Sequence, residues 1–246
     1  MSLVYYFDIG NTRVKFWRCR DNQVEGRASV SHGGHPEAAI ALLPELFAAM
    51  PDAVLGGSVL DDRTMLMFTQ ACLCAWRRLP DYAHSTLRHA GVINAYGADS
   101  ARLGVDRWLG LIAAQAMPGD VCVVDCGTAV TLDVLRRDGQ HLGGYILPGL
   151  AMMSDVLSHE TEKVRFDTAL PATLALGCST SESVVNGTMM AVVSMVERVA
   201  AEHQAHLVLT GGDADSVSPF LSIQHIVEPE LLLHGLQRYF ADAGIR

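Results

Sequence analysis

Apolar and polar residues follow the same order in the two halves of the chain. Each half opens with an apolar run that ends in an aspartate and a glycine, Asp8-Ile9-Gly10 and Asp125-Cys126-Gly127, 117 residues apart (125 minus 8). Turn residues return 13 positions after each aspartate, at Asp21-Asn22 and Asp138-Gly139 (21 minus 8 and 138 minus 125). Apolar runs separated by such turns predict antiparallel strands. The pattern therefore predicts one three-stranded meander, made twice.

Helical periodicity follows each meander. Apolar residues three and four positions apart predict helices, and short apolar runs predict strands. The expected helices span residues 36–50, 61–76, 105–116, 179–199 and 229–240, and the expected further strands span 53–59 and 207–209. Pro118-Gly119 ends one helix and marks the expected boundary between domains 1–117 and 118–246. Meander, helix, strand and helix recur, which predicts an α/β fold of two duplicated domains, each a mixed sheet with flanking helices, and a cleft between them.

Composition narrows the class of protein. Half of the 246 residues are hydrophobic, and 27 acidic residues outnumber 18 basic ones, for a net charge of -9. A sequence-independent grip on nucleic acid needs a basic face, so we expect no nucleic-acid partner. No uncharged apolar stretch reaches the 18 to 20 or so residues of a membrane helix, and the first residues lack a signal-peptide pattern. We therefore expect a cytoplasmic protein without a membrane partner.

Cysteine and histidine spacings indicate no structural zinc. The six cysteines form no C-x-x-C pair, and the ten histidines show no H-x-x-x-H spacing with a following carboxylate. In a cytosolic chain, free cysteines of this kind are typical packing residues.

The two Asp-x-Gly turns are candidate phosphate loops. A glycine after a buried strand lets backbone N–H groups approach an anion, while the aspartate can hold a cation. Lys15 lies two strand positions beyond Arg13 and so on the same side, within reach of a phosphate. Taken singly, each turn is also consistent with an ordinary hairpin, and Lys15 with a solvated cation on an edge strand. The repetition favours the phosphate interpretation.

Other motifs carry two interpretations each. Asp106, at the start of the helix from residue 105, is placed for a general base or for stabilising the helix dipole. Arg107 can clamp a carboxylate or pair with a surface acid. Thr180 lies at the start of a helix whose Ser179 and Glu182 form a capping box. The free N–H groups there favour an anionic ligand near Thr180, and the alternative is that the motif only caps the helix. Gly211-Gly212 suits a flat base or a tight turn.

These motifs together resemble the acetate and sugar kinase, Hsp70 and actin superfamily and, within it, the type III pantothenate kinases. The resemblance rests on five motifs in the family's order: residues 8–12, 104–107, 125–129, 143–149 and 210–212. It implies duplicated ribonuclease H-like, or actin-like ATPase, domains. It also implies transfer of the γ-phosphoryl group of ATP to the primary hydroxyl of pantothenate, which gives 4'-phosphopantothenate in the first step of coenzyme A synthesis.

The resemblance assigns roles to individual residues. Asp106 would be the catalytic proton acceptor, with Gly104, Val105, Arg107, Tyr96 and Thr180 at the pantothenate site. ATP would contact Asp8, Ile9, Gly10, Asn11, Thr12, Arg13, Val14, Lys15 and Thr128. Asp125 would ligate a monovalent cation, K⁺ or NH₄⁺, and Mg²⁺ would arrive with ATP. The family forms homodimers, and the Thr180 contact is expected to cross the interface. Asn186-Gly187 replaces the family's usual Ser-Gly.

Two other functions fit the sequence. One is a non-catalytic, nucleotide-binding regulator or accessory factor of the same fold, which uses ATP to close the cleft. The other is a kinase for a different small hydroxy acid. The kinase hypotheses require Asp8 and Asp125 to converge on one triphosphate.

Overall fold

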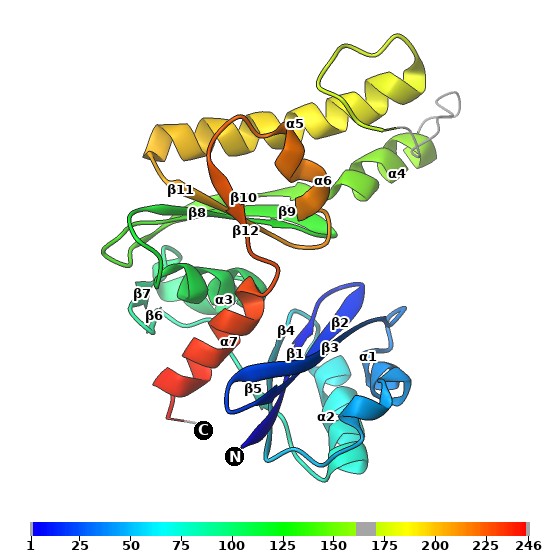
Figure 1. Cartoon of the computed structure of the whole chain (residues 1–246), viewed down its shortest axis with the longest axis vertical. Helices are drawn as coiled ribbons and strands as arrows, with labels where there is room; N and C mark the ends of the chain where they lie inside the picture. The colour runs from blue at the N-terminus through cyan, green and yellow to red at the C-terminus, as the bar shows by residue number, and fades with distance from the viewer. Residues whose placement is uncertain (1, 161–170, 245–246) are drawn as a thin grey trace. The chain divides into compact units, whose positions relative to one another are not determined.

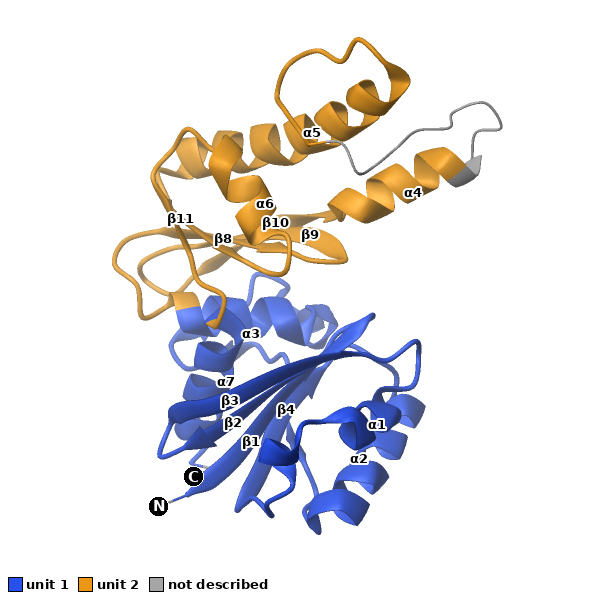
Figure 2. Ribbon diagram, turned by 45° about the vertical axis from the view of Figure 1, so that its right-hand side comes forward, with its two compact units in different colours: residues 1–113, 231–246 blue, residues 114–230 orange. Residues whose placement is uncertain are grey.

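The computed structural model describes residues 2–160 and 171–244, which divide into two compact units. Unit 1 comprises residues 1–113 and 231–246, and unit 2 comprises residues 114–230 (Figure 2). This division differs from the expected 1–117 and 118–246, because the last helix, α7 (Leu231–Asp242), belongs to unit 1. Its buried residues Leu232, Leu236 and Phe240 pack in one cluster with Val4 and Tyr6. Burial of this apolar face against the first sheet explains the difference.

The sheet of unit 1 has five strands in the order β3-β2-β1-β4-β5 (Figure 1). The strands are β1 (Leu3–Ile9), β2 (Arg13–Arg20), β3 (Gln23–Ser31), β4 (Ala53–Ser58) and β5 (Asp81–Tyr82). The first three form the expected antiparallel meander, and β4 pairs parallel to β1. A mixed sheet of this kind is what the sequence pattern predicts for each half.

Two helical layers cover the sheet of unit 1. The residues of β1 alternate between the faces, so Leu3, Tyr5 and Phe7 pack against α2 (Asp62–Trp76) and the short α1 (Pro36–Ala39). Val4 and Tyr6 point to the other face, which α3 (Val105–Ala114) and α7 cover. The small hairpin β6 (Arg88–His89) and β7 (Val92–Ile93) and the 3₁₀ turn η3 (Gly97–Arg102) lead into α3.

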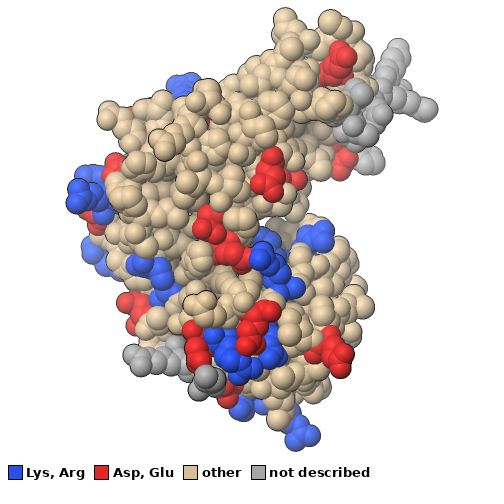
Figure 3. Space-filling model, viewed as in Figure 1, with Lys and Arg blue, Asp and Glu red and all other residues tan. Residues whose placement is uncertain are grey.

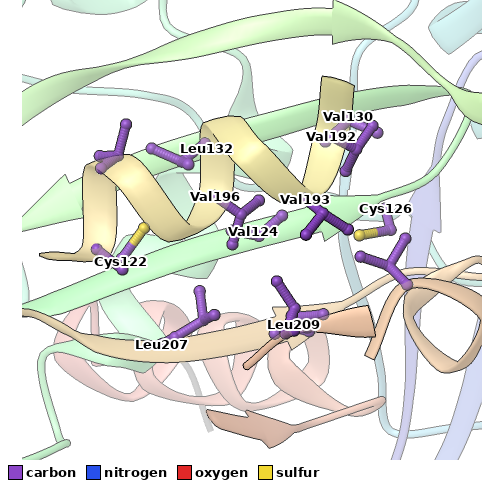
Figure 4. Close-up of a cluster of buried hydrophobic side chains, with 14 of the residues drawn as sticks. Cys122, Val124, Cys126, Val130, Leu132, Val192, Val193, Val196, Leu207 and Leu209 are labelled. Atoms are coloured by element: carbon purple, nitrogen blue, oxygen red, sulfur yellow. The ribbon is translucent and has the colours of Figure 1, made fainter. Parts of the chain in front are cut away.

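Unit 2 repeats this strand order. Its sheet runs β10-β9-β8-β11-β12, built from β8 (Val121–Cys126), β9 (Ala129–Leu135), β10 (His141–Pro148), β11 (His206–Thr210) and β12 (His225–Val227). The long helix α5 (Thr180–His203) packs Val192, Val193 and Val196 against β8 and β11 (Figure 4). The helices α4 (Leu150–Glu160) and α6 (Ala214–Val217) and the turn η4 (Ser218–Phe220) complete the unit. The expected duplication is therefore present in the backbone.

Two sequence expectations need correction. The predicted helix over residues 36–50 breaks into α1 and two 3₁₀ turns, η1 (Ile40–Leu42) and η2 (Glu45–Phe47). Pro44 explains this, because proline disfavours a helical conformation in the preceding residue, and Leu43 is extended with φ -69° and ψ 144°. The second concerns cysteine: four are buried as expected, whereas Cys74 and Cys178 are exposed.

Among the described residues, one helix, α5, has the length and the apolar composition that a membrane span requires. Its apolar residues form the core against the sheet of unit 2, and a buried core helix passes the same test.

Candidate functional site

The first predicted phosphate loop is an exposed turn on a buried strand. Asp8, near the end of β1, is only 5% exposed, and Lys15 lies opposite it in the register with β2. The Gly10 N–H donates to the Arg13 carbonyl at 3.0 Å and closes the turn. The tip residues Asn11 and Thr12 are exposed. The loop therefore presents its tip to solvent while the carboxylate stays in the sheet.

The start of α3 lies beside the same end of the sheet. Asp8 pairs with Gly57 of β4 in the parallel register. A Cβ atom placed on Gly57 would be 3.3 Å from a methyl group of Val105, the first residue of α3. Because Asp8, Lys15 and Tyr6 share the sheet face that α3 covers, the structure brings the first loop and Asp106 to one region of unit 1.

Asp106 and Arg107 are fixed at the first turn of α3. The half-buried Asp106 accepts a hydrogen bond from the Arg107 N–H at 2.7 Å. A Cβ atom on Gly104 would lie 2.5 Å from Asp106 Oδ1, so the glycine makes room for the carboxylate. Arg107 is 8% exposed and donates from Nη1 to the Tyr96 hydroxyl at 3.1 Å, with its guanidinium 6.0 Å from the centre of that ring. The predicted substrate residues of unit 1 therefore form one cluster.

Asn94 organises the loop that carries Tyr96. Its side chain is 3% exposed and accepts the Tyr96 N–H at 3.0 Å. The same amide donates to the carbonyls of Thr86 and Ser100 at 3.3 and 3.2 Å. No motif in the sequence marks Asn94, and the available signal is its place in a stretch of loop residues two positions before Tyr96.

The second predicted phosphate loop surrounds a half-buried carboxylate, Asp125. Gly127 N–H donates to the Ala129 carbonyl at 3.1 Å, and Thr128 at the tip is exposed. Gly211, with φ +94°, passes so close to the Asp125 carboxylate that a Cβ atom there would clash with it. Thr210 pairs with Asp125 in the register, and its buried hydroxyl has no hydrogen-bond partner among the described residues. A carboxylate and a hydroxyl are oxygen donors, the type of ligand that hard cations prefer.

A cavity of about 420 Å³ lies within unit 2, next to this loop. Helices α4, α5 and α6 line it, and Leu150, Ser154, Thr188, Asp213, Ser216 and Phe220 are among its residues. Asp213 follows Gly211-Gly212, and its N–H donates to the Cys126 carbonyl at 2.9 Å. Burial raises the pKa of the Asp213 carboxyl. No sequence motif marks the Asp213 carboxylate, because its burial depends on α4 and α5, which lie far from it along the chain.

Thr180 is exposed at the first turn of α5, in unit 2, and does not line this cavity. Ser179 accepts the Glu182 N–H at 3.2 Å, and Glu182 accepts the Cys178 N–H at 2.6 Å, which confirms the capping interaction. Asn186 is buried and accepts the Thr173 N–H at 2.9 Å. Asn186 also donates to the Ala175 carbonyl at 3.0 Å, so this departure from the family pattern fixes residues 173–175 against α5.

The family model for type III pantothenate kinase matches residues 4–202. The chain belongs to the type III pantothenate kinase family. A type III pantothenate kinase from Chromohalobacter salexigens is 37% identical and aligns with 97% of this chain and 87% of its own. One from Acinetobacter baumannii is 34% identical over 96% of both chains. Family membership confirms the resemblance seen in the sequence.

Solved structures support the fold of this family member. The crystal structure of a Baf family protein from Campylobacter jejuni covers 98% of both chains with a TM-score of 0.66 at 19% identity. At that identity the likeness concerns the fold alone. The α/β fold with two ribonuclease H-like domains, expected from the sequence, is confirmed.

Proposed function

We propose that this chain is a pantothenate kinase, an ATP-dependent phosphotransferase with an alcohol acceptor. It transfers the γ-phosphoryl group of ATP to the primary hydroxyl of pantothenate and gives 4'-phosphopantothenate, in the first step of coenzyme A synthesis. The observation that supports the proposal is the packing of Val105, the residue before Asp106, against Gly57, which pairs with Asp8 of the first loop, in a chain of this family.

Asp106 is the general base of the proposed reaction. The pantothenate hydroxyl is an unactivated alcohol, so its oxygen needs a positioned proton acceptor while it bonds to the γ-phosphorus. Asp106 accepts that proton as the bond from the γ-phosphorus to the β-bridging oxygen breaks and ADP leaves. The Arg107 guanidinium, held by Tyr96, binds the pantothenate carboxylate. Gly104 and Val105 line the same site.

The two loops hold the polyphosphate. Residues 8–15 supply backbone N–H groups and the Lys15 ammonium to the phosphates, and Thr128 supplies the contact from the second loop. The Asp8 carboxylate would face the Mg²⁺ that is bound with ATP. Mg²⁺, bound with ATP, neutralises charge on the transferred group. Asp125, with the Thr210 hydroxyl beside it, holds K⁺ or NH₄⁺. Convergence of Asp8 and Asp125 on one triphosphate stays a prediction.

An apolar surface of unit 2 supports a homodimer. Exposed apolar side chains lie on β10, α4 and α5: Tyr145, Met152, Val156, Leu157 and Met190, with Ile146 on the opposite face of β10 from Tyr145. Figure 3 shows few charged side chains over α4 and α5 on the face in view. Asp155 is an exposed charged residue on α4 beside them. A largely apolar surface with few charges is typical of permanent interfaces. In the proposed dimer Thr180 contacts the substrate of the partner subunit. Sedimentation of a Val156→Asp variant as a monomer would support the apolar interface.

The proposed enzyme works in the cytoplasm and binds ATP and pantothenate, with no nucleic-acid or membrane partner. A coupled assay of ADP release tests the function. We expect release to require pantothenate and to rise when K⁺ or NH₄⁺ is added. Slow ATP hydrolysis that ignores pantothenate would instead indicate a regulatory switch. ADP release with another hydroxy acid, but not with pantothenate, would indicate a different kinase.

A further inference from the structure

His32 lies directly after β3 and beneath the first phosphate loop. Its side chain is buried, with 7% of the residue exposed. The ring nitrogen Nε2 lies 3.0 Å from the Gly10 carbonyl oxygen, and Nδ1 lies 3.1 Å from the Gly34 nitrogen. The His32 backbone N–H also donates to the Thr12 carbonyl at 3.1 Å. One residue therefore holds two carbonyls of the loop.

These partners fix the protonation of the ring. A backbone N–H can only donate, so Nδ1 accepts the hydrogen bond from Gly34 and carries no proton. A carbonyl oxygen can only accept, so Nε2 carries the proton and donates to Gly10. His32 is therefore a neutral imidazole in a single tautomer. Gly33 and Gly34, with φ of 54° and 89°, let the chain turn back so that the Gly34 N–H reaches the ring.

The bond to Gly10 sets the direction of the next N–H group. In a trans peptide the C=O of one residue and the N–H of the next lie in one plane and point in opposite directions. Holding the Gly10 carbonyl on His32 therefore aims the Asn11 N–H away from His32, at the exposed tip of the loop. A backbone N–H aimed outward from a glycine turn is a donor for a phosphate oxygen.

We propose that His32 is a positioning residue for the phosphates of ATP. As the neutral Nε2–H tautomer, it orients the Gly10–Asn11 peptide so that the Asn11 N–H meets a phosphate oxygen. His32 itself contacts neither substrate. This inference rests on the proposed function, because it takes the first loop as the ATP site.

Calorimetric titration with a non-hydrolysable ATP analogue tests the role directly. We expect His32→Leu, which fills the space without the hydrogen bonds, to weaken analogue binding about five- to tenfold. His32→Gln, whose amide N–H can donate to Gly10, should recover part of that loss. The KM for pantothenate should change less than twofold. His35→Gln is the matched control, because the exposed His35 ring lies in the same connection and contacts the Glu37 carboxylate instead of the first loop. This variant should bind the analogue like the wild type.

Wild-type affinity in folded His32→Leu, or an equal loss for ATP and for pantothenate, would overturn the proposal. Nitrogen-15 NMR of wild-type His32 tests it without any variant: the Nε2–H tautomer supports the proposal, and the Nδ1–H tautomer or a doubly protonated ring overturns it. The proposed function fails separately, if the wild type releases no ADP with pantothenate. In that case the binding titration still decides the role of His32.

Discussion

The two units share one strand order, but they hold their loops differently. The residue directly after the third strand of each meander donates its N–H to a loop carbonyl: His32 to Thr12 at 3.1 Å, and Gly149 to Thr128 at 2.9 Å. His32 adds its imidazole beneath the first loop. Gly149 instead lies so close to the Gly127 and Thr128 carbonyls that a Cβ atom there would clash with both. At equivalent positions, the imidazole of His32 supports the first loop, whereas the lack of a side chain at Gly149 lets the backbone approach the second loop.

A second pair of equivalent residues also differs. In each unit one strand, β4 or β11, pairs parallel to the first strand of the meander. β4 ends at Ser58 and β11 at Thr210, so Asp61 and Asp213 each lie three residues beyond the end of that strand (61 minus 58 and 213 minus 210). Asp61 caps α2, and the hydrogen bond from the Thr64 N–H lowers the pKa of its carboxyl. Asp213 makes no capping bond to α6 and lines the cavity of unit 2, where burial raises its pKa. Equivalent aspartates of the two units therefore differ in hydrogen bonding and in the direction of their pKa shift, although the backbone is duplicated.

Substitution of the two loop carboxylates, Asp8 and Asp125, is expected to give the largest difference in turnover between the two units. Asp8→Asn should lower turnover about 100-fold at any K⁺ concentration, because it removes charge beside the transferred phosphate and its Mg²⁺. Asp125→Asn should keep turnover at high K⁺ but require about tenfold more K⁺ for half-maximal rate. Steady-state rates over a K⁺ titration measure both. Identical behaviour of the two variants would break the comparison.

Much of this comparison was predictable from the sequence. The Asp-x-Gly turns and the apolar runs before them predict both meanders, because strand alternation and turn residues are local signals. The position of Asp106 in the first turn of a helix was also predictable, since apolar periodicity begins at Val105.

Contacts across long stretches of chain were not predictable. The Gly10–His32 bond joins residues 22 positions apart, and no local pattern marks it. Asp213 is desolvated by helices whose packing only the fold reveals. Helix α7 follows β12 of unit 2 in the sequence, but its apolar residues pack on the sheet of unit 1. Helical periodicity predicts the apolar face of α7 but not the sheet against which that face packs.

The free energy of unfolding tests whether the close backbone approach at Gly149 is required, with Gly10 of the first loop for comparison. Gly149→Ala should lower the free energy of unfolding by about 1 to 3 kcal/mol, because backbone carbonyls face the added methyl group and cannot move cheaply. Gly10→Ala is the matched control, since its Cβ would lie 3.4 Å from the Arg13 carbonyl, an ordinary contact. Urea unfolding measures both. Equal stability of the two variants would show that the close approach of Gly149 is not required.

The smallest effects concern Asp61 and Asp213. A lowered pKa stabilises the fold above the unfolded value near 3.8, and this gain is lost as the pH falls. A raised pKa does the opposite: the folded state binds the proton more tightly, so stability is lost as the pH rises through the folded value. At pH 7, Asp61→Asn should therefore lower the Tm slightly and Asp213→Asn should raise it. Both differences should shrink in acid, and melting curves from pH 3 to 7 without nucleotide check the signs.

The central claim is that Asp106 accepts the proton of the pantothenate hydroxyl. Measuring turnover and ATP-analogue binding of Asp106→Asn tests it most directly. The claim predicts that turnover falls by about 10² to 10⁴ while analogue affinity stays near that of the wild type. Near wild-type turnover in this variant would contradict it.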